Sequence, residues 1–384
     1  MLKTLHVIYG MMPGGAETYL PNLVGKMGEL AGVRNEVIVQ TVPGPMSENL
    51  ENLGIPVYYA GMRKGYDPPG IARMAKMIRR ANPDIIHGHS NNPALNFMLR
   101  FYTTPKVYTE HAGDLLGGSW KSTAIYGPLD PGYRFFVAIS GMAAERMEGV
   151  NPRIRQRIRI VHNGINIEKI DAAPVAGDTD LPAAFLAAPR RVGTIGSLTP
   201  QKGPETFLKT ASLLARQDDG VAFAMVGDGP LRETAQRLAR RLGIADRVHF
   251  LGYRTDAMSV LKTFDVFLFT SNWEPFGLVL TEAMAARVPV VSLNVNSAAS
   301  EIITDGREGM LVDEKSPELL AERTIQLLRD GALRESIILN ARRRVEVHFT
   351  IERNAKSIFD LYRECLCSDQ TSSSSDVMQP EIRV

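Results

Sequence analysis

Cysteine is nearly absent from this 384-residue chain, which contains only Cys365 and Cys367. Two cysteines this close together provide no disulfide framework, and such scarcity suits a reducing compartment. The pair is also a weak metal motif, because no second pair of ligands stands at a matching spacing. We therefore expect two unremarkable surface thiols.

Long apolar runs are missing too: no uncharged stretch approaches the roughly 18 residues that span a bilayer. The opening segment, MLKTLHVIYGMMPGGA, resembles a secretion signal in having a lysine before an apolar stretch. That stretch is short and contains His6, so a first buried strand is the better interpretation. We expect a cytoplasmic protein, either soluble or peripheral at the inner face of the membrane.

The chain has little net charge, only +2 at pH 7. This charge balance does not require a nucleic-acid partner. Residues 1–170 nevertheless carry 19 Lys and Arg against 13 Asp and Glu, so a basic first half could favour anionic partners. In residues 71–81, helical spacing places Arg73, Lys76 and Arg80 on one face. Such a face either rests on anionic lipid or is simply solvated.

Short apolar strands alternate with amphipathic helices along most of the chain, which predicts an α/β fold with parallel sheets. Residues 1–170 form one such doubly wound domain, and residues 190–350 form a second one. Between them, residues 171–189 lack periodicity and are predicted to be a linker. Residues 351–367 are predicted as a closing helix, and the Ser-rich residues 368–384 as a disordered tail.

Ligands of doubly wound sheets bind where strands end and helices begin, so the strand-to-helix loops carry the candidate site. The first loop contains Gly14 and Gly15, which allow close backbone approach to a phosphate or simply form a tight turn. It lacks the G-x-G-x-x-G fingerprint of dinucleotide-binding proteins. In the second domain, GTIGSLTPQKG places Lys202 beside a helix start, where it meets a phosphate or is solvated. Gly227, in VGDGP, is expected to shape the floor of the site.

Three histidines end strands of the first domain: His87, His89 and His111. At such positions imidazoles bind sugar hydroxyls or transfer protons. Strand alternation favours a packed core position for His87. A metal site is disfavoured because the spacing gives no firm third ligand. The DTD sequence at 178–180 follows no strand and is predicted to be a solvated loop.

The segment EPFGLVLTE carries Glu274 and Glu282 around an apolar run. We predict that a buried helix begins at Pro275, with Glu274 at its N-terminus and Glu282 about two turns in. Acids favour a helix start, which alone accounts for Glu274. A carboxylate inside an apolar helix is costly unless it has a partner, so Glu282 indicates a site.

These motifs together resemble family 4 of the retaining glycosyltransferases, which have the GT-B fold. The resemblance rests on EPFGL with E-x7-E, the Lys202–Gly203 pair, VGDGP, FLGY, NGIN and GGAE, and it covers residues 5 to about 365. It implies two Rossmann-like domains facing across a cleft, with a C-terminal helix crossing back to the first. It also implies transfer of a sugar from a nucleotide sugar, UDP-linked or GDP-linked, to a glycan, lipid-linked or small-molecule acceptor in polysaccharide or glycolipid assembly.

The resemblance assigns roles to single residues. It implies that Glu282 binds the donor ribose, Glu274 the donor sugar, and Lys202 the diphosphate, while His111 lies against the transferred sugar. The catalytic candidates are His111, Glu274 and Lys202, with no metal and no cofactor. The donor-binding candidates are Gly15, Gly196, Ser197, Lys202, Gly227, Gly252, Tyr253, Glu274, Phe276, Gly277, Leu278 and Glu282. The acceptor-binding candidates are Glu17, His89, Asn91 and His111.

The chain departs from the family pattern at two places. Ser197 stands where the family commonly has a basic residue, so Arg191, Arg254 or another arginine would have to assist Lys202. Ala298 and Ala299 replace a pair of glycines before Glu301. Two alternatives therefore stay open: a non-catalytic, nucleotide-binding partner subunit of the same fold, and a GT-B epimerase acting on the donor.

Overall fold

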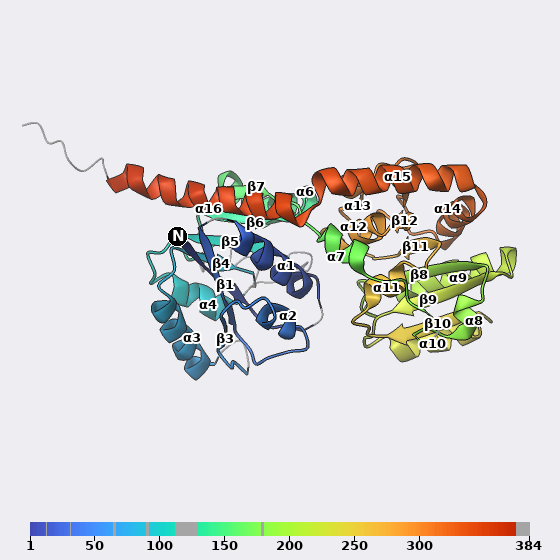
Figure 1. Cartoon of the computed structure of the whole chain (residues 1–384), viewed down its shortest axis with the longest axis horizontal. Helices are drawn as coiled ribbons and strands as arrows, with labels where there is room; N and C mark the ends of the chain where they lie inside the picture. The colour runs from blue at the N-terminus through green and yellow to red at the C-terminus, as the bar shows by residue number, and fades with distance from the viewer. Residues whose placement is uncertain are drawn as a thin grey trace, which may run out of the picture. The chain divides into compact units, whose positions relative to one another are not determined.

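The computed structural model describes residues 1–12, 14–30, 32–63, 67–89, 92–111, 127, 130–177 and 180–373, without the side chains of 368–373. The chain forms two compact units. The first comprises residues 1–164 together with the segment from 351 onward, and the second comprises residues 165–350. Each is an α/β unit built on a parallel sheet, as the alternating pattern predicted (Figure 1).

In the described part of the chain, the first unit has a seven-stranded parallel sheet in the order β3-β2-β1-β4-β5-β6-β7. The strands are β1 (Leu2–Ile8), β2 (Val33–Val39), β3 (Val57–Tyr59), β4 (Ile85–Gly88), β5 (Lys106–Glu110), β6 (Phe135–Ala138) and β7 (Ile158–Ile160). The helices are α1 (Gly15–Glu29), α2 (Glu48–Glu51), α3 (Pro68–Ala81), α4 (Pro93–Leu99), α6 (Gly141–Val150), the 3-10 helix η2 (Pro152–Arg157) and α16 (Ile351–Ser373).

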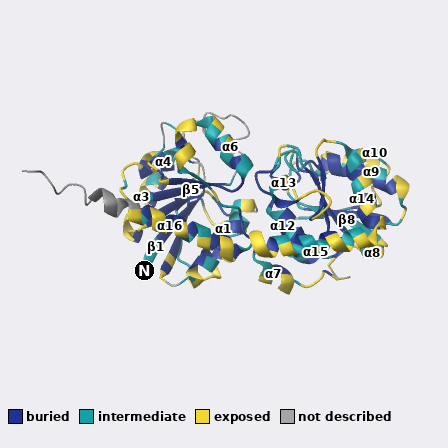
Figure 2. Cartoon of the chain, turned by 90° about the horizontal axis from the view of Figure 1, so that it is seen from above, coloured by how far each residue is buried: buried dark blue, intermediate teal, exposed yellow. Residues whose placement is uncertain are grey.

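Side-chain caps begin several of these helices. Asp67 accepts a hydrogen bond from the Gly70 amide at the start of α3, and Ser140 accepts one from Ala143 at the start of α6. Such caps satisfy amides that a helix start leaves free. The helices then cover the sheets, so most of the central strands are buried, whereas the edge strands β3 and β7 are only partly buried and the helices keep exposed faces (Figure 2).

The last helix, α16, packs on the first unit although it follows the second in sequence (Figure 1). Asn354 accepts a hydrogen bond from the Tyr19 hydroxyl at 2.8 Å and donates one to the carbonyl of His162 at 2.7 Å. The Tyr362 hydroxyl lies 2.6 Å from Nδ1 of the buried His87. The C-terminal helix predicted to return to the first domain is thus present.

The second unit has a six-stranded parallel sheet among the described residues, in the order β10-β9-β8-β11-β12-β13. The strands are β8 (Arg190–Ile195), β9 (Val221–Val226), β10 (Val248–Gly252), β11 (Val266–Phe269), β12 (Val290–Leu293) and β13 (Met310–Val312). The helices are α7 (Ile167–Ala172), α8 (Ala183–Leu186), α9 (Pro204–Gln217), α10 (Arg232–Arg241), α11 (Ala257–Leu261), α12 (Leu278–Ala285), α13 (Ala299–Ile302), α14 (Pro317–Arg329) and α15 (Gly331–His348).

The predicted linker, residues 171–189, is instead packed into the second unit, whose boundary lies after Gly164 rather than after residue 170. Phe185 on α8 is fully buried, and its ring contacts those of His249 and Phe264. The Ala176 amide donates to the Ser259 carbonyl at 3.1 Å. The segment lacks periodicity because single side chains, rather than a helical face, attach it to the sheet.

Two further predictions about the C-terminal region are wrong in part. Helix α16 continues to Ser373, so it includes the first residues of the predicted disordered tail; residues 374–384 lie outside the described part of the chain. Cys367 is exposed as expected, but Cys365 is buried, and burial raises the pKa of its thiol to about 12. Cys365 faces inward because α16 has a packed side.

Replacing Phe185 by alanine tests whether the segment 171–189 belongs to the second unit's core. We expect Phe185→Ala to lower the free energy of unfolding by about 3–5 kcal/mol, because it leaves a cavity where a ring was buried. Val175→Ala is the control, since Val175 is 63% exposed in the same segment. Urea unfolding of the full chain measures both; equal, small effects would contradict the packing described here.

Candidate active site

The centre of the site in the second unit is an ion pair between Lys202 and Glu274. Lys202 follows β8, Glu274 follows the neighbouring strand β11, and Nζ lies 2.5 Å from Oε2. Glu274 is only 7% exposed, and its Oε2 also lies 3.4 Å from the Ser271 hydroxyl. A buried carboxylate needs such partners. The structure therefore brings together two of the three catalytic candidates.

The loop after Glu274 differs from the predicted helix start. Helix α12 begins at Leu278, not at Pro275, because Gly277 before it has φ +90°, a left-handed conformation suited to glycine. Glu274 consequently lies ahead of the helix. Its amide donates to the Asn296 carbonyl at 3.0 Å, and its carbonyl accepts from the Ala298 amide at 3.1 Å.

This change moves Glu274 away from the helix terminus but leaves the amide positions of the loop intact. Phe276 is buried, and its ring packs against that of Phe349. Gly277 and Leu278 stand at the start of α12, where backbone amides have no partner within the helix. The helix-start amides remain candidates for contacting a ligand.

Glu282 lies in α12, one turn after the helix begins, and is half-buried. Desolvation raises the pKa of its carboxyl from 4.5 to about 7, and the positive charge of Lys169 on α7 opposes that shift. A carboxyl with such a pKa is partly protonated near neutrality, so it can both donate and accept hydrogen bonds.

Three of the predicted glycines meet at the ends of adjacent strands. The Gly227 amide donates to the Gly252 carbonyl at 2.7 Å. A Cβ at Gly227 would lie 2.0 Å from the carbonyl oxygen of Gly196, so no larger residue fits there. The stem of Lys202 passes within ordinary contact of the Gly196 Cβ position. The glycines therefore form a close-packed backbone surface beside the lysine.

In the first unit, Gly14 caps α1, which begins at Gly15. The Glu17 carboxylate folds back over Gly14, and desolvation raises the pKa of Glu17. Two other expectations fall on residues outside the described part of the chain: Asn91, and Asp178 with Thr179 of the DTD sequence.

The three predicted histidines, His87, His89 and His111, lie in one cluster that also contains His6. Nδ1 of His89 lies 3.0 Å from Nε2 of His111, and Nε2 of His89 lies 3.0 Å from Nδ1 of His6. His89 is buried with both ring nitrogens occupied, which argues against the predicted direct contact with an acceptor. His87 is a packed core residue bonded to Thr109 and Tyr362.

His6, His87 and His89 each offer a ring nitrogen within 4.8 Å of the others, close enough for a shared metal ion. All six of these nitrogens, however, lie at hydrogen-bond distance from a partner: Asn35, His6, His89, His111, Thr109 or Tyr362. Binding a metal would break several of these bonds at once. The geometry fits a hydrogen-bonded cluster better than a metal centre.

Comparison with known proteins identifies the family. The sequence model "Glycosyltransferase Family 4" matches residues 13–169, and "Glycosyl transferases group 1" matches residues 184–344. Together they cover most of both units. The chain belongs to family 4 of the glycosyltransferases.

Relatives of this glycosyltransferase include an uncharacterized glycosyltransferase from Methanocaldococcus jannaschii, at 30% identity over 59% of each chain. Another is the UDP-Gal:alpha-D-GlcNAc-diphosphoundecaprenol alpha-1,3-galactosyltransferase of Escherichia coli, at 23% identity over 83% of this chain and 86% of that one. Among solved structures, Anabaena HepE in complex with UDP and glucose has a TM-score of 0.82 at 21% identity, covering 95% of this chain and all of the other. That likeness confirms the GT-B fold.

The glycosyltransferase has Ser197 where a second cation was expected, and the two suggested substitutes are paired with acids. Arg254 makes two hydrogen bonds to Asp256, and Arg191 contacts Asp265. Sequence reasoning missed Arg232, at the start of α10. Its guanidinium lies 3.5 Å from the Gly252 Cβ position, 3.2 Å from Asp228 and 3.2 Å from the Phe250 carbonyl. The signal was available in GDGPLRE, directly after the recognised glycines.

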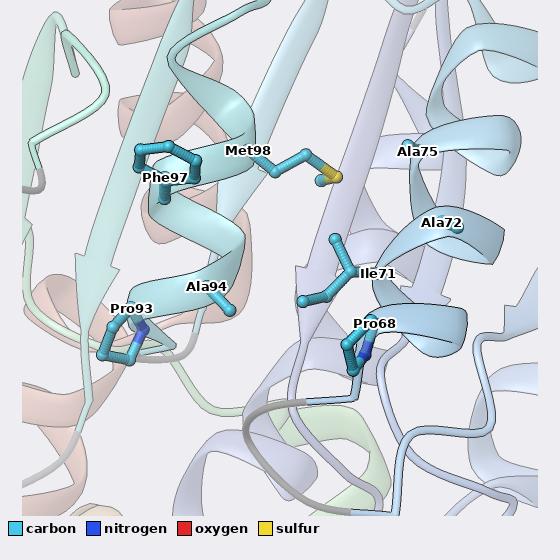
Figure 3. Close-up of a pocket in the computed structure, with 8 residues that line it drawn as sticks. All are labelled: Pro68, Ile71, Ala72, Ala75, Pro93, Ala94, Phe97 and Met98. Atoms are coloured by element: carbon cyan, nitrogen blue, oxygen red, sulfur yellow. The ribbon is translucent and has the colours of Figure 1, made fainter.

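A separate apolar groove of about 540 Å³ lies between α3 and α4 of the glycosyltransferase (Figure 3). It is lined by Pro68, Ile71, Ala72, Ala75, Pro93, Ala94, Phe97 and Met98. Phe97 is 54% exposed, and its ring packs edge-on against that of the exposed Phe101. Across the described residues, no helix combines the length and apolarity needed to cross a bilayer.

The raised pKa of Glu282 predicts a pH-dependent stability. In the folded chain the carboxyl binds its proton up to about pH 7, so stability falls as pH rises from about 4.5 to 7 and is then level. We expect Glu282→Gln to remove this loss. Relative to wild type, the variant should gain about 2 kcal/mol in free energy of unfolding between pH 5 and pH 8.

Urea unfolding at several pH values measures the difference between the two proteins. Glu335→Gln provides the matched control, because Glu335 is an exposed acid on α15 of the same unit. A Glu282→Gln curve parallel to that of wild type from pH 5 to pH 8 would contradict the assigned environment.

Proposed function

We propose that this protein transfers a sugar from a nucleotide-sugar donor to a hydroxyl of an acceptor. One observation carries the proposal: the candidate residues of the second unit follow the carboxyl ends of adjacent parallel strands. Gly252 ends β10, Gly227 follows β9, Gly196 and Lys202 follow β8, and Glu274 follows β11. That edge is where open α/β sheets bind nucleotides. The family membership and the UDP-bound relative HepE support the same interpretation.

In the proposed complex, Lys202 neutralises the donor diphosphate. Its ammonium has three donors, so it can keep Glu274 as a partner while it binds a phosphate oxygen. The glycine surface beside it lets the donor approach the backbone closely. Arg232 also pairs with an acid, the exposed Asp228, but it lies beside Gly252 at the same edge, where it would serve as a second cation in place of one at Ser197.

The other contacts to the nucleotide sugar follow the order of residues 274–282 along the chain. Glu274 binds the sugar ring, the amides near Gly277 meet the phosphate or a hydroxyl, and Glu282 binds the ribose. The base rests near Gly252 and Tyr253, which is 48% exposed. We favour a UDP-sugar and keep a GDP-sugar as the alternative.

We further propose a retaining, metal-independent transfer. Cationic and amide donors placed at the leaving diphosphate stabilise its developing charge, which is the role a metal ion would otherwise fill. A front-face route requires no nucleophile from the protein. The acceptor is a glycan, a lipid-linked sugar or a small molecule, held by the first unit near His111 and Glu17, in assembly of a surface polysaccharide or glycolipid.

Nucleotide binding tests the donor site. We expect UDP, or GDP in its place, to stabilise the full chain by about 2.7 kcal/mol at 100 times its Kd. Glu282→Ala should weaken that stabilisation because the ribose loses a partner. Glu274→Gln should mainly lower turnover in a donor-hydrolysis or transfer assay, by about tenfold or more.

The result that overturns the proposal is the absence of any thermal shift with UDP, GDP and ADP. Glu335→Gln serves again as the variant with an exposed carboxyl removed. Binding without turnover on a panel of nucleotide sugars would instead favour the non-catalytic subunit, and interconversion of the donor without an acceptor would favour the epimerase.

We also propose that α3 and the groove beside it rest on an anionic membrane surface. Lys76 and Arg80 are exposed on α3, whose residues Ile71 and Ala75 line the apolar groove. Arg73 is partly committed elsewhere, since it donates to the carbonyls of Ala60 and Gly61. Cations beside exposed apolar side chains suit the boundary between headgroups and acyl chains. The E. coli relative, whose named acceptor carries an undecaprenol, supports a lipid-linked substrate.

Vesicle binding tests this surface. We expect sedimentation with vesicles containing anionic lipid, weakened by salt and absent with neutral lipid. Lys76→Gln/Arg80→Gln should reduce binding about 30-fold, because each basic side chain near such a surface contributes about 1 kcal/mol. Arg240→Gln/Arg241→Gln on α10 makes the same charge change on an exposed helix of the second unit and should bind like wild type. Equal loss in both variants, or no binding at low salt, would reject the proposal.

A further inference from the structure

Three imidazoles form a hydrogen-bonded row through the first unit. His6 lies on β1, His89 directly follows β4, and His111 directly follows β5. Successive rings are joined by nitrogen–nitrogen distances of 3.0 Å, and both pairs are stacked with interplanar angles of 23° and 24°. In such a row the tautomer of one ring determines the tautomer of the next, because each hydrogen bond requires a donor on one ring and an acceptor on the other.

Asn35, on β2, fixes the direction of the row at its buried end. Its Nδ2 donates to the backbone carbonyl of Val24 at 2.9 Å, and a carbonyl can only accept. The amide orientation is thereby set. Its Oδ1 accepts from the Thr4 hydroxyl at 2.6 Å and lies 3.4 Å from Nε2 of His6. Since Oδ1 also only accepts, the hydrogen of His6 must be on Nε2.

The remaining tautomers follow one by one from the neutral form of each ring. With its hydrogen on Nε2, His6 offers Nδ1 as an acceptor, so His89 must donate from Nε2. Nδ1 of His89 is then an acceptor, and His111 must donate from its own Nε2. Nδ1 of His111 is left without a hydrogen. Burial keeps the rings neutral: it lowers the pKa of His6 to about 4 and that of His111 to about 3, and lowers the pKa of His89 as well.

We propose that Asn35, His6 and His89 are positioning residues that hold His111 in its Nε2–H tautomer and keep Nδ1 as a hydrogen-bond acceptor. In the part of the chain that the structure describes, Nδ1 of His111 has no hydrogen-bond partner. We assign a hydroxyl of the sugar substrate as the hydrogen-bond partner of this Nδ1, and this last step rests on the proposed function. The opposite tautomer would present an N–H at the same point, so the hydroxyl would have to accept a hydrogen bond there instead of donating one.

His87 supplies an internal comparison. It pairs with His6 in the register of β1 and β4 and is equally buried. Its two ring nitrogens contact the hydroxyls of Thr109 and Tyr362, at 2.7 and 2.6 Å. A hydroxyl can donate or accept, so these bonds impose no direction on the ring. His87 is therefore packed against the row but makes no hydrogen bond to it, so it does not affect the tautomers of the row.

The tautomer can be read directly in the ligand-free protein. Long-range proton–nitrogen correlation spectra of the full chain with ¹⁵N-labelled histidine show which ring nitrogen carries the hydrogen. The chain has seven histidines, so single substitutions assign the signals. We expect His6, His89 and His111 to be protonated at Nε2 only at neutral pH. A hydrogen on Nδ1 of His111 in wild type overturns the proposal; the variants serve only to assign the signals, and the deciding spectrum is that of the wild-type protein.

Two substitutions of His6 separate the effect of hydrogen-bond direction along the row from the effect of side-chain packing. His6→Phe removes the hydrogen bond to Asn35, so His111 should become a mixture of tautomers. Turnover should then fall about fivefold, which is the loss typical of one neutral hydrogen bond. UDP binding should be unchanged. His6→Gln should restore both, because its amide nitrogen donates to Asn35 and its oxygen accepts from His89.

His87→Phe is the control for packing and should leave the His111 tautomer as in wild type. A mixture of tautomers in His87→Phe, or an unchanged His111 spectrum in His6→Phe, would contradict the role of the row. Failure of the proposed function is distinguishable, because it shows as absent nucleotide binding whereas the spectra are recorded without any ligand.

Discussion

A carboxylate that leaves water must be paired or hydrogen-bonded, and in the second unit that requirement falls on Glu274. Lys202 and Ser271 meet its side chain, while Asn296 and Ala298 hold its backbone. These partners come from the loops after β8, β11 and β12, three neighbours in the sheet. One buried charge thus joins the loops that build the site. A ligand entering there meets a lysine already fixed in place, which reduces the ordering required on binding.

The sequence could predict the edge of the sheet at which the site lies, but not the details within it. Parallel strands all end at one edge, so residues directly after buried strands gather there whatever their side chains do. That argument located Gly196, Lys202, Gly227 and Glu274 correctly at strand ends. It placed the start of α12 three residues too early, because an apolar run beginning PFG reads as helix throughout. Only the packed loop reveals that Gly277 takes a left-handed conformation.

Long-range pairing explains what sequence reasoning missed in the first unit. His87, His89 and His111 were recognised from their places after strands, whereas His6 counted only as part of a first strand. Their connection depends on β2, β1, β4 and β5 lying side by side, an order that no local pattern contains. The segment 171–189 is similar: Phe185 is a core residue only because the sheet of the second unit is beside it.

The first unit is discontinuous along the chain, and this has a consequence for its assembly. Residues 351–373 supply Asn354 and Tyr362 to its interior, where they meet Tyr19 and His87. A ribosome delivers the chain from the N-terminus, so the whole second unit emerges before these partners do. Until then, the buried imidazole of His87 lacks its hydrogen-bond partner Tyr362, and the hydroxyl of Tyr19 lacks its acceptor Asn354. The second unit can complete its fold first, and the first unit closes only after residues 351–373 have been made.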